Sequence, residues 1–255
     1  MSQSDPIRER YFKSVALADK WADLLFYFGG VMSLATMLLD KAVYPTAYNW
    51  LQVLFAVSVL ALFAVGLASR LYLTPRAEDK RRQDFFSSAY GVGLSGLERT
   101  DGYYNNSQPP GTRRMAAQVL ENSHFSKAIA LRMARVERAK IVVYMVLWLV
   151  CLMHRETDLG IVVAASQAVF SEQLISRWLR LECLPLRYEK TYDDVCRLFH
   201  STPLAQTFDA MALESLGIYE AAKANGGVTL SSKLFHQLNG ELSREWERTR
   251  AQMNI

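Results

Sequence analysis

Apolar residues in this chain are gathered into long uncharged runs that alternate with charged segments. Residues 42–69 carry no formal charge over 28 consecutive positions, and residues 24–39 form a second uncharged run. A helix rises about 1.5 Å per residue, so the longer run reaches across a hydrocarbon core of about 30 Å. The two runs predict a transmembrane hairpin with a turn at Pro45, where Tyr44 and Tyr48 suit the headgroup region. A buried hairpin of a soluble protein is the alternative.

A second pair of uncharged runs is shorter. Residues 141–153 and 159–171 each hold 13 uncharged positions, which span about 20 Å as a helix. Lys140 and Arg155 can snorkel from the ends of the first run, and the second can continue to residue 178 if its charged side chains face protein or water. These segments predict a second hairpin and four membrane crossings in total. Two crossings with a membrane-dipping hairpin are the alternative.

Lysine and arginine are distributed unevenly around these runs. The two short connecting loops hold one each, Lys41 and Arg155, and the other regions hold 27 of the 29. Cytoplasmic loops of membrane proteins carry the excess of positive charge. The distribution therefore predicts that both termini and the central region lie in the cytoplasm.

The segments outside the membrane runs show helical periodicity and no strand alternation. Residues 113–145 continue without a helix breaker after a Pro-Pro-Gly sequence, which predicts one long helix that enters the third run. We predict an all-α, polytopic membrane protein with four transmembrane helices (2+2) and an α-helical cytosolic domain built from the central insertion and the C-terminal tail. The predicted parts are a cytosolic N-terminus (1–20), a first transmembrane hairpin (21–70), a cytosolic helical insertion (71–138), a second transmembrane hairpin (139–178) and a cytosolic helical C-terminal region (179–255).

Composition and motifs exclude several classes. Of the 255 residues, 51% are hydrophobic and 21% charged, which is too apolar for a disordered chain and too uncharged for a coiled coil. Three cysteines cannot form a disulfide framework, and the four histidines are scattered. The sequence has no H-E-x-x-H, no phosphate-binding P-loop and no nucleophile elbow. We expect no enzyme, no metal site and no cofactor; a membrane-embedded enzyme with a sparse site is the less favoured alternative.

Polar residues lie within the fourth run. Ser166, Gln173 and Arg177 share one helical face, and Glu172 is adjacent to it. Polar groups at membrane depth face a protein or water-filled interior, which makes these four residues candidates for lining a pore. Hydrogen bonding between the helices of one bundle is an equal alternative.

Arginines recur at every third position immediately before the third run, as Arg132, Arg135 and Arg138. Such a cluster favours an anchor to anionic lipid, which contributes about 1 kcal/mol per charge near the surface. A site for the phosphates of a ligand is the sharper alternative, because guanidinium groups match phosphate oxygens.

The insertion also carries a short motif. Asp101, Tyr103, Tyr104 and Asn105 form a D-x-Y-Y-N turn that is followed by prolines. The next helix has an R-x-x-x-Q-x-x-x-N pattern, formed by Arg114, Gln118 and Asn122. Together with the 2+2 topology, Tyr219 and the tail sequence LFHQLNGELSREWERTR, this motif resembles the SMODS-associated four-transmembrane effectors, a pore-forming family of bacterial CBASS anti-phage systems.

The resemblance implies an effector of abortive infection. A partner nucleotidyltransferase would make a cyclic oligonucleotide, which would reorganise a homo-oligomer and permeabilise the bacterial inner (plasma) membrane. Tyrosines can stack on bases, asparagine can read base edges and arginines can hold phosphates. A channel or scaffold gated by lipid or another signal is the alternative. The candidate ligand-binding residues are Tyr103, Tyr104, Asn105, Arg113, Arg114, Gln118, Asn122, Arg132 and Arg135.

Overall fold

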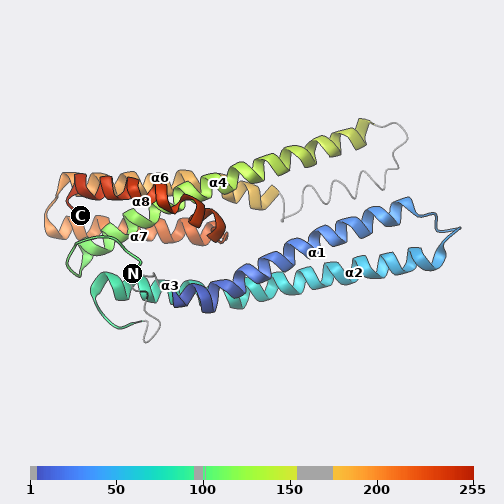
Figure 1. The fold of residues 1–255 in the computed structure, drawn as a ribbon, viewed down its shortest axis with the longest axis horizontal. Coiled ribbons are helices and arrows are strands. Elements are labelled where there is room, and N and C mark those ends of the chain that lie inside the picture. Colours follow the sequence, from blue (N-terminus) through green and yellow to red (C-terminus); the bar gives the residue numbers. More distant parts are fainter. Residues whose placement is uncertain (1–4, 95–99, 101, 154–174) are drawn as a thin grey trace. The chain divides into compact units, whose positions relative to one another are not determined.

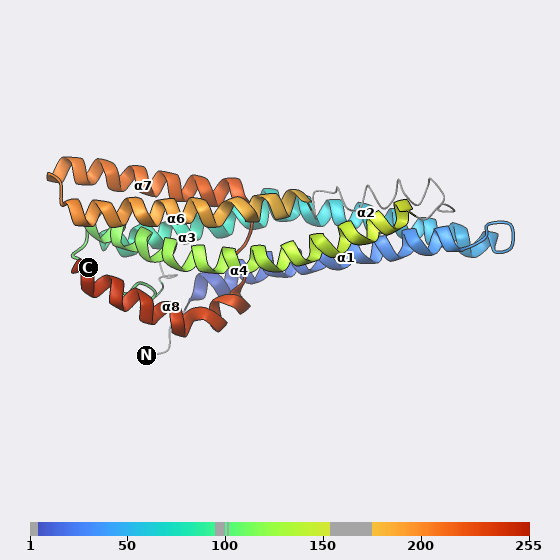
Figure 2. The ribbon, with the colours of Figure 1, turned by 90° about the horizontal axis from the view of Figure 1, so that it is seen from above.

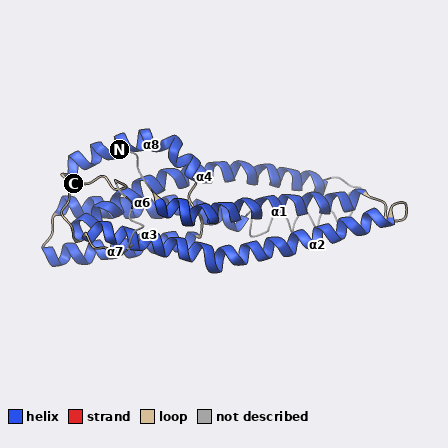
Figure 3. Cartoon of the chain, turned by 60° about the horizontal axis from the view of Figure 1, so that its bottom comes forward, coloured by secondary structure: helices blue, strands red, loops and turns tan. Residues whose placement is uncertain are grey.

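The computed structural model describes residues 5–94, 100, 102–153 and 175–255, and all regular structure in these ranges is helical (Figure 3). The all-α prediction is therefore confirmed for them. The chain divides into two compact units. The apolar unit comprises Ile7–Lys80 and Val142–Leu174, and the helical unit comprises Met1–Pro6, Arg81–Ile141 and Ile175–Ile255.

The apolar unit contains an antiparallel helical hairpin (Figure 1). A π-helical turn, η1 (Arg8–Phe12), leads into α1 (Lys13–Leu38). The chain turns at Asp40, whose side-chain Oδ1 accepts the backbone N–H of Ala42 at 2.8 Å, and α2 (Pro45–Ala68) then begins with proline in its first turn. Proline is favoured there because the first helical N–H groups have no partner within the helix.

The two helices of the hairpin approach closely at Gly29. A Cβ atom built on Gly29 would lie 2.8 Å from Oγ of Ser58, which is 3% exposed. Oγ of Ser58 donates to the carbonyl of Phe55 at 2.7 Å, so this polar group is satisfied within α2. Small residues at a helix contact allow backbones to pack tightly without a polar interface.

One helix among the described residues is long and apolar enough to cross a membrane. It runs without interruption over Pro45–Tyr90, through α2, the π-helical η2 (Ser69–Leu73) and α3 (Thr74–Tyr90). Its most apolar stretch has a mean hydropathy of 2.4, and only 6% of that stretch is buried. Leu60 and Phe63, for example, are largely exposed. Residues 159–171, the predicted core of the fourth crossing, lie outside the described residues.

Four further helices supply most of the helical unit. They are α4 (Thr112–Met153), α6 (Arg177–Ser201), α7 (Ala205–Gly226) and α8 (Ser232–Met253). The predicted long helix after the Pro-Pro-Gly sequence is confirmed, because α4 runs unbroken into the third apolar run. Helix α6 includes residue 178, the predicted end of the second hairpin, and it continues through Pro185.

The core of the helical unit is formed where α4 meets the tail helices. Figures 1 and 2 show α6 and α7 side by side, joined by a short link at residues 202–204. Burying a large apolar side chain contributes about 1.5–3 kcal/mol, so this cluster accounts for much of the unit's stability. Its fully or nearly fully buried members include Met115, Val119, Leu120, Leu181, Leu184, Tyr188, Phe208, Leu216, Tyr219 and Trp246.

Two glycines of α7 give a matched stability prediction. A Cβ on Gly226 would lie 2.7 Å from Cδ2 of Leu184, which is buried, whereas a Cβ on Gly217 would have no heavy atom within 4 Å. Gly226→Ala should overpack the α6–α7 contact and cost about 1–3 kcal/mol. Gly217→Ala lies in the helix interior and should stabilise by up to about 1 kcal/mol. Thermal unfolding of the detergent-solubilised chain measures both, and shifts of the same sign would contradict the assigned contact.

Candidate functional site

The loop that precedes α4 is anchored at both ends. At its start, the backbone N–H of Thr100 donates to Oδ1 of Asp84 at 3.0 Å, and the hydroxyl of Thr100 donates to Oδ2. Asp84 is fully buried, so this carboxylate has its hydrogen bonds supplied by the loop. At its end, the N–H of Gly111 donates to the carbonyl of Ala89 at 2.9 Å. The D-x-Y-Y-N turn is thus held on α3 from both sides.

The two tyrosines of the turn pack edge to face. Their ring centroids are 4.9 Å apart, and the Tyr104 ring meets Phe85 of α3 at 6.0 Å. The guanidinium of Arg81 lies 5.0 Å from the Tyr103 ring centroid, and Nη2 of Arg81 donates to Asp5 at 2.7 Å. Burial raises the pKa of both phenols, so they remain neutral hydrogen-bonding groups at physiological pH.

Asn105 is the point where the loop, α4 and α8 meet. Its backbone N–H donates to both carboxylate oxygens of Glu121, at 3.2 and 3.1 Å. Its carbonyl accepts from Nε1 of Trp246 at 2.9 Å, and its side-chain Oδ1 accepts from Nη1 of Arg250 at 2.5 Å. We call the set Tyr103, Tyr104, Asn105, Glu121, Asn122, Trp246 and Arg250 the Asn105 junction.

The α4 side of this junction contributes two neighbouring polar residues. Asn122 donates from Nδ2 to the hydroxyl of Tyr104 at 3.4 Å. Glu121 is 7% exposed, and burial raises its pKa to about 7, although the N–H of Asn105 and the charge of Arg250 act in the opposite direction. The junction therefore holds a carboxyl group that changes charge near neutral pH.

His124 lies two residues after Asn122 on α4 and faces α8. Its ring is 5.9 Å from Tyr192 and 6.5 Å from Trp246, and its Nε2 is 3.2 Å from the carbonyl of Leu242. Burial lowers the pKa of His124, although Leu242 and Glu245 favour its charged form. The imidazole therefore serves as a mainly neutral packing group beneath α8.

The remaining predicted residues of the insertion do not join the junction. Gln118 is fully buried and donates from Nε2 to Oγ of Ser88 at 2.9 Å, so it ties α4 to α3. The guanidinium of Arg113 lies 5.0 Å from the ring of Phe208 and 5.6 Å from that of Phe199, where α6 and α7 meet. Arg114, which follows Arg113 in the sequence, is half-buried.

The arginines that precede the third apolar run are also distant from the junction. Arg132 and Arg135 are exposed and follow Asn122 by ten and thirteen residues, which corresponds to about 15 and 20 Å along α4. Arg138 instead forms a two-point contact with Glu182 of α6, in which its Nε donates at 2.9 Å. The structure thus brings four of the predicted ligand-binding residues together, namely Tyr103, Tyr104, Asn105 and Asn122. The predicted arginines Arg132 and Arg135 lie apart from them.

The predicted pore-lining residues fall largely outside the described ranges. Ser166, Glu172 and Gln173 belong to residues 154–174, of which nothing is described. Arg177 is half-buried and is the first residue of α6. Within the described ranges, no group of three or more His, Cys, Asp or Glu side chains could hold a metal ion.

Sequence reasoning missed Glu121, Trp246 and Arg250. Glu121 directly precedes the motif residue Asn122, and Trp246 and Arg250 are four residues apart, so they share a face of α8. The four-residue spacing of Trp246 and Arg250 was the signal in the sequence that could have identified them as partners on one helix face. In chemical terms the junction offers aromatic rings, amide groups and a guanidinium, which are the groups that bind bases and phosphates.

Comparisons with protein-family models, with curated proteins and with solved structures give no match for this chain.

Proposed function

We propose that this chain is a cyclic-oligonucleotide-responsive membrane effector, which oligomerises and permeabilises the bacterial inner membrane in anti-phage defence. The observation that carries the proposal is the Asn105 junction, where two tyrosines, two asparagines and an arginine meet between the insertion and the tail. Such side chains stack on bases, read their edges and hold phosphates. A partner nucleotidyltransferase would supply the ligand, and no cofactor is required.

The membrane part of the proposal has four crossings with both termini in the cytoplasm. It is supported by the charge distribution and by apolar side chains that are exposed on several helices. Trp21 and Val31 of α1 are about half exposed, and Val142 and Val150 near the end of α4 are 60% exposed. Helices that are apolar on their outer faces suit a lipid environment.

Ligand binding would compete with the attachment of α8. In the present state the Asn105 amide oxygen and carbonyl are occupied by Arg250 and Trp246. A nucleotide that takes the Asn105 amide and receives Arg250 on a phosphate would favour the state in which α8 has left the loop. A ligand shifts a conformational equilibrium only through the difference between its affinities for the two states. The exchange of partners at Asn105 would supply that difference, because only the state with α8 detached leaves Asn105 and Arg250 available to the ligand.

Helix α4 provides the route from the junction to the membrane. The same continuous helix carries Glu121 and Asn122 in its first part and the apolar residues 141–153 in its last. A change at its junction end can therefore alter how the apolar end packs in an oligomer, without an intervening flexible link.

Dye release from proteoliposomes tests the proposal. We expect at least one cyclic di- or trinucleotide of a broad panel to release trapped dye. Tyr103→Leu should then raise the half-maximal concentration by about 5- to 150-fold, because stacking of a base contributes about 1–3 kcal/mol. Tyr90→Leu, at the end of α3 and outside the junction, is the matched control. The proposal fails if no nucleotide binds or causes leakage.

A channel or scaffold gated by anionic lipid is the second candidate. It is favoured by Arg132 and Arg135, which are exposed on α4 close to the third apolar run. Under this alternative, the Arg132→Ala, Arg135→Ala double variant weakens binding to anionic vesicles by about 1 kcal/mol per charge. Nucleotides would then neither bind nor change leakage.

A further inference from the structure

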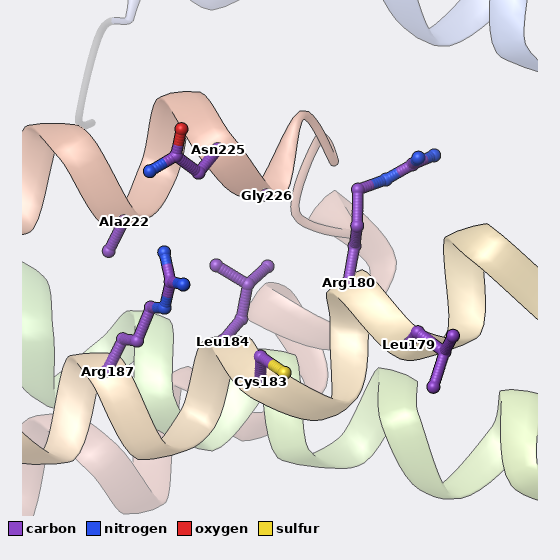
Figure 4. Close-up of a pocket in the computed structure, with 8 residues that line it drawn as sticks. All are labelled: Leu179, Arg180, Cys183, Leu184, Arg187, Ala222, Asn225 and Gly226. Carbon is purple, nitrogen blue, oxygen red and sulfur yellow. The ribbon is translucent and has the colours of Figure 1, made fainter.

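A pocket separate from the Asn105 junction lies between α6 and α7 of the helical unit (Figure 4). Its volume is about 240 Å³, and it is partly open to solvent. Helix α6 supplies its floor and both of its arginines, and the end of α7 supplies the opposite wall. The lining residues are Leu179, Arg180, Cys183, Leu184, Arg187, Ala222, Asn225 and Gly226.

The shape of the pocket depends on the close approach of the two helices at Gly226. Any side chain at this position would collide with Leu184, since a Cβ would lie 2.7 Å from its Cδ2. Figure 4 shows Arg187 extending from α6 toward Ala222 of α7 on one side of Leu184, and Arg180 extending past the end of α7 on the other side. The pocket therefore has an apolar centre with a guanidinium toward each end.

The charge of the pocket is of one sign. No aspartate or glutamate lines it, while Arg180, Arg187 and the amide of Asn225 do. Arg187 is exposed, and no ion pair engages it among the described residues. The two arginines are seven residues apart, which places them about 10 Å apart along α6. A guanidinium group can form two parallel hydrogen bonds to a phosphate, so Arg187 can hold a phosphate group, and Arg180 can contact the far end of a longer anion.

We propose that this pocket binds a phosphate ester, with the phosphate on Arg187 and the carbon part over Leu179 and Leu184. Two sources have this chemistry, an anionic phospholipid headgroup and a soluble phosphate ester. In the sequence the pocket begins immediately after residue 178, the predicted end of the fourth crossing, which would place it at headgroup depth. The placement at headgroup depth rests on the proposed membrane topology, while binding of a phosphate ester does not depend on nucleotide sensing at the Asn105 junction.

The exposed thiol of Cys183 allows this to be measured on the full chain. Cys183 lines the pocket and is free, whereas Cys196 is half-buried, and burial raises its pKa to about 11. Alkylation by N-ethylmaleimide in neutral detergent is followed for each cysteine by peptide mass spectrometry. The added ligands are dihexanoyl phosphatidylglycerol and glycerol 3-phosphate. A ligand at four times its Kd should slow Cys183 alkylation about fivefold by mass action, and leave Cys196 unchanged.

Two variants make the result specific. Arg187→Ala should abolish the protection of Cys183, while Arg197→Ala, an exposed arginine further along α6, should retain it. Protection by the lipid alone assigns a phospholipid, and protection by both ligands assigns the phosphate group itself. Protection by neither ligand, or equal protection in Arg187→Ala, overturns the inference. Nucleotide-triggered dye release, measured on the same preparation, shows separately whether the proposed function holds.

Discussion

Replacing Trp246 with alanine should detach α8 from the rest of the helical unit and lower its free energy of unfolding by about 3–5 kcal/mol. Trp246 is 1% exposed and belongs to the core cluster that α4 and the tail helices share. Its Nε1 also supplies the hydrogen bond to the carbonyl of Asn105. The truncation removes a large buried ring and leaves that carbonyl without its donor, so two costs coincide. Hydrogen exchange of the α8 amides and denaturant unfolding measure the effect.

Two further substitutions on the same helix separate these costs. Trp246→Phe keeps most of the apolar packing and loses the donor, so we expect a smaller loss of about 1–3 kcal/mol. Arg248→Ala changes an exposed residue two positions away and should stay within about 0.5 kcal/mol of the parent chain. Under the proposed function, Trp246→Ala also raises dye leakage without nucleotide. Unchanged exchange of α8 in Trp246→Ala would show that the ring does not hold the helix.

The helices that follow the first apolar hairpin were largely predictable because their signals are local. The Pro-Pro-Gly sequence ends one segment, and the thirty residues after it contain no breaker, so the start of α4 at Thr112 follows from backbone chemistry. The continuity of α6 was not predictable in the same way. Pro185 suggests a break, but α6 continues through it, because several buried side chains on both sides of the proline pack into one core.

The candidate site was predictable in part. The D-x-Y-Y-N turn and Asn122 do meet, as the hydrogen bond between Asn122 and Tyr104 shows. The α8 partners of Asn105 are 141 and 145 residues away in the sequence, and no periodicity pairs positions at that distance. The role of an arginine also cannot be predicted from its residue type alone, since a guanidinium can bind phosphate or stack on aromatic rings. Arg113 stacks on Phe199 and Phe208, which only the packing of α6 on α7 brings together.

Stability should fall as pH rises through the range in which Glu121 loses its proton. The pKa of Glu121 is raised from 4.5 to about 7 in the folded chain, mainly by burial. Below about pH 4.5 the carboxyl group is protonated in both the folded and the unfolded chain. Between these values the unfolded chain ionises first, which favours unfolding. We expect a loss of about 3 kcal/mol that is complete slightly above pH 7.

Glu121→Gln isolates this contribution from other titrating groups. The amide oxygen can still accept the N–H of Asn105, but it has no proton to lose. His124, whose pKa is lowered by burial, acts with the opposite sign, because its contribution is lost as the pH falls through its folded pKa. The difference between the parent chain and Glu121→Gln removes this term, since both chains contain His124.

The difference in unfolding free energy should therefore be near zero at pH 4.5 and favour Glu121→Gln by about 3 kcal/mol above pH 7. Denaturant titrations followed by tryptophan fluorescence at several pH values give this curve. Glu247→Gln, at an exposed position of α8, should give a flat difference curve. A curve for Glu121→Gln that is flat or that falls with pH would mean that Glu121 is ionised in the folded chain. The junction would then contain a buried carboxylate that accepts the N–H of Asn105 and is stabilised by the charge of Arg250, and removing its charge would loosen α8.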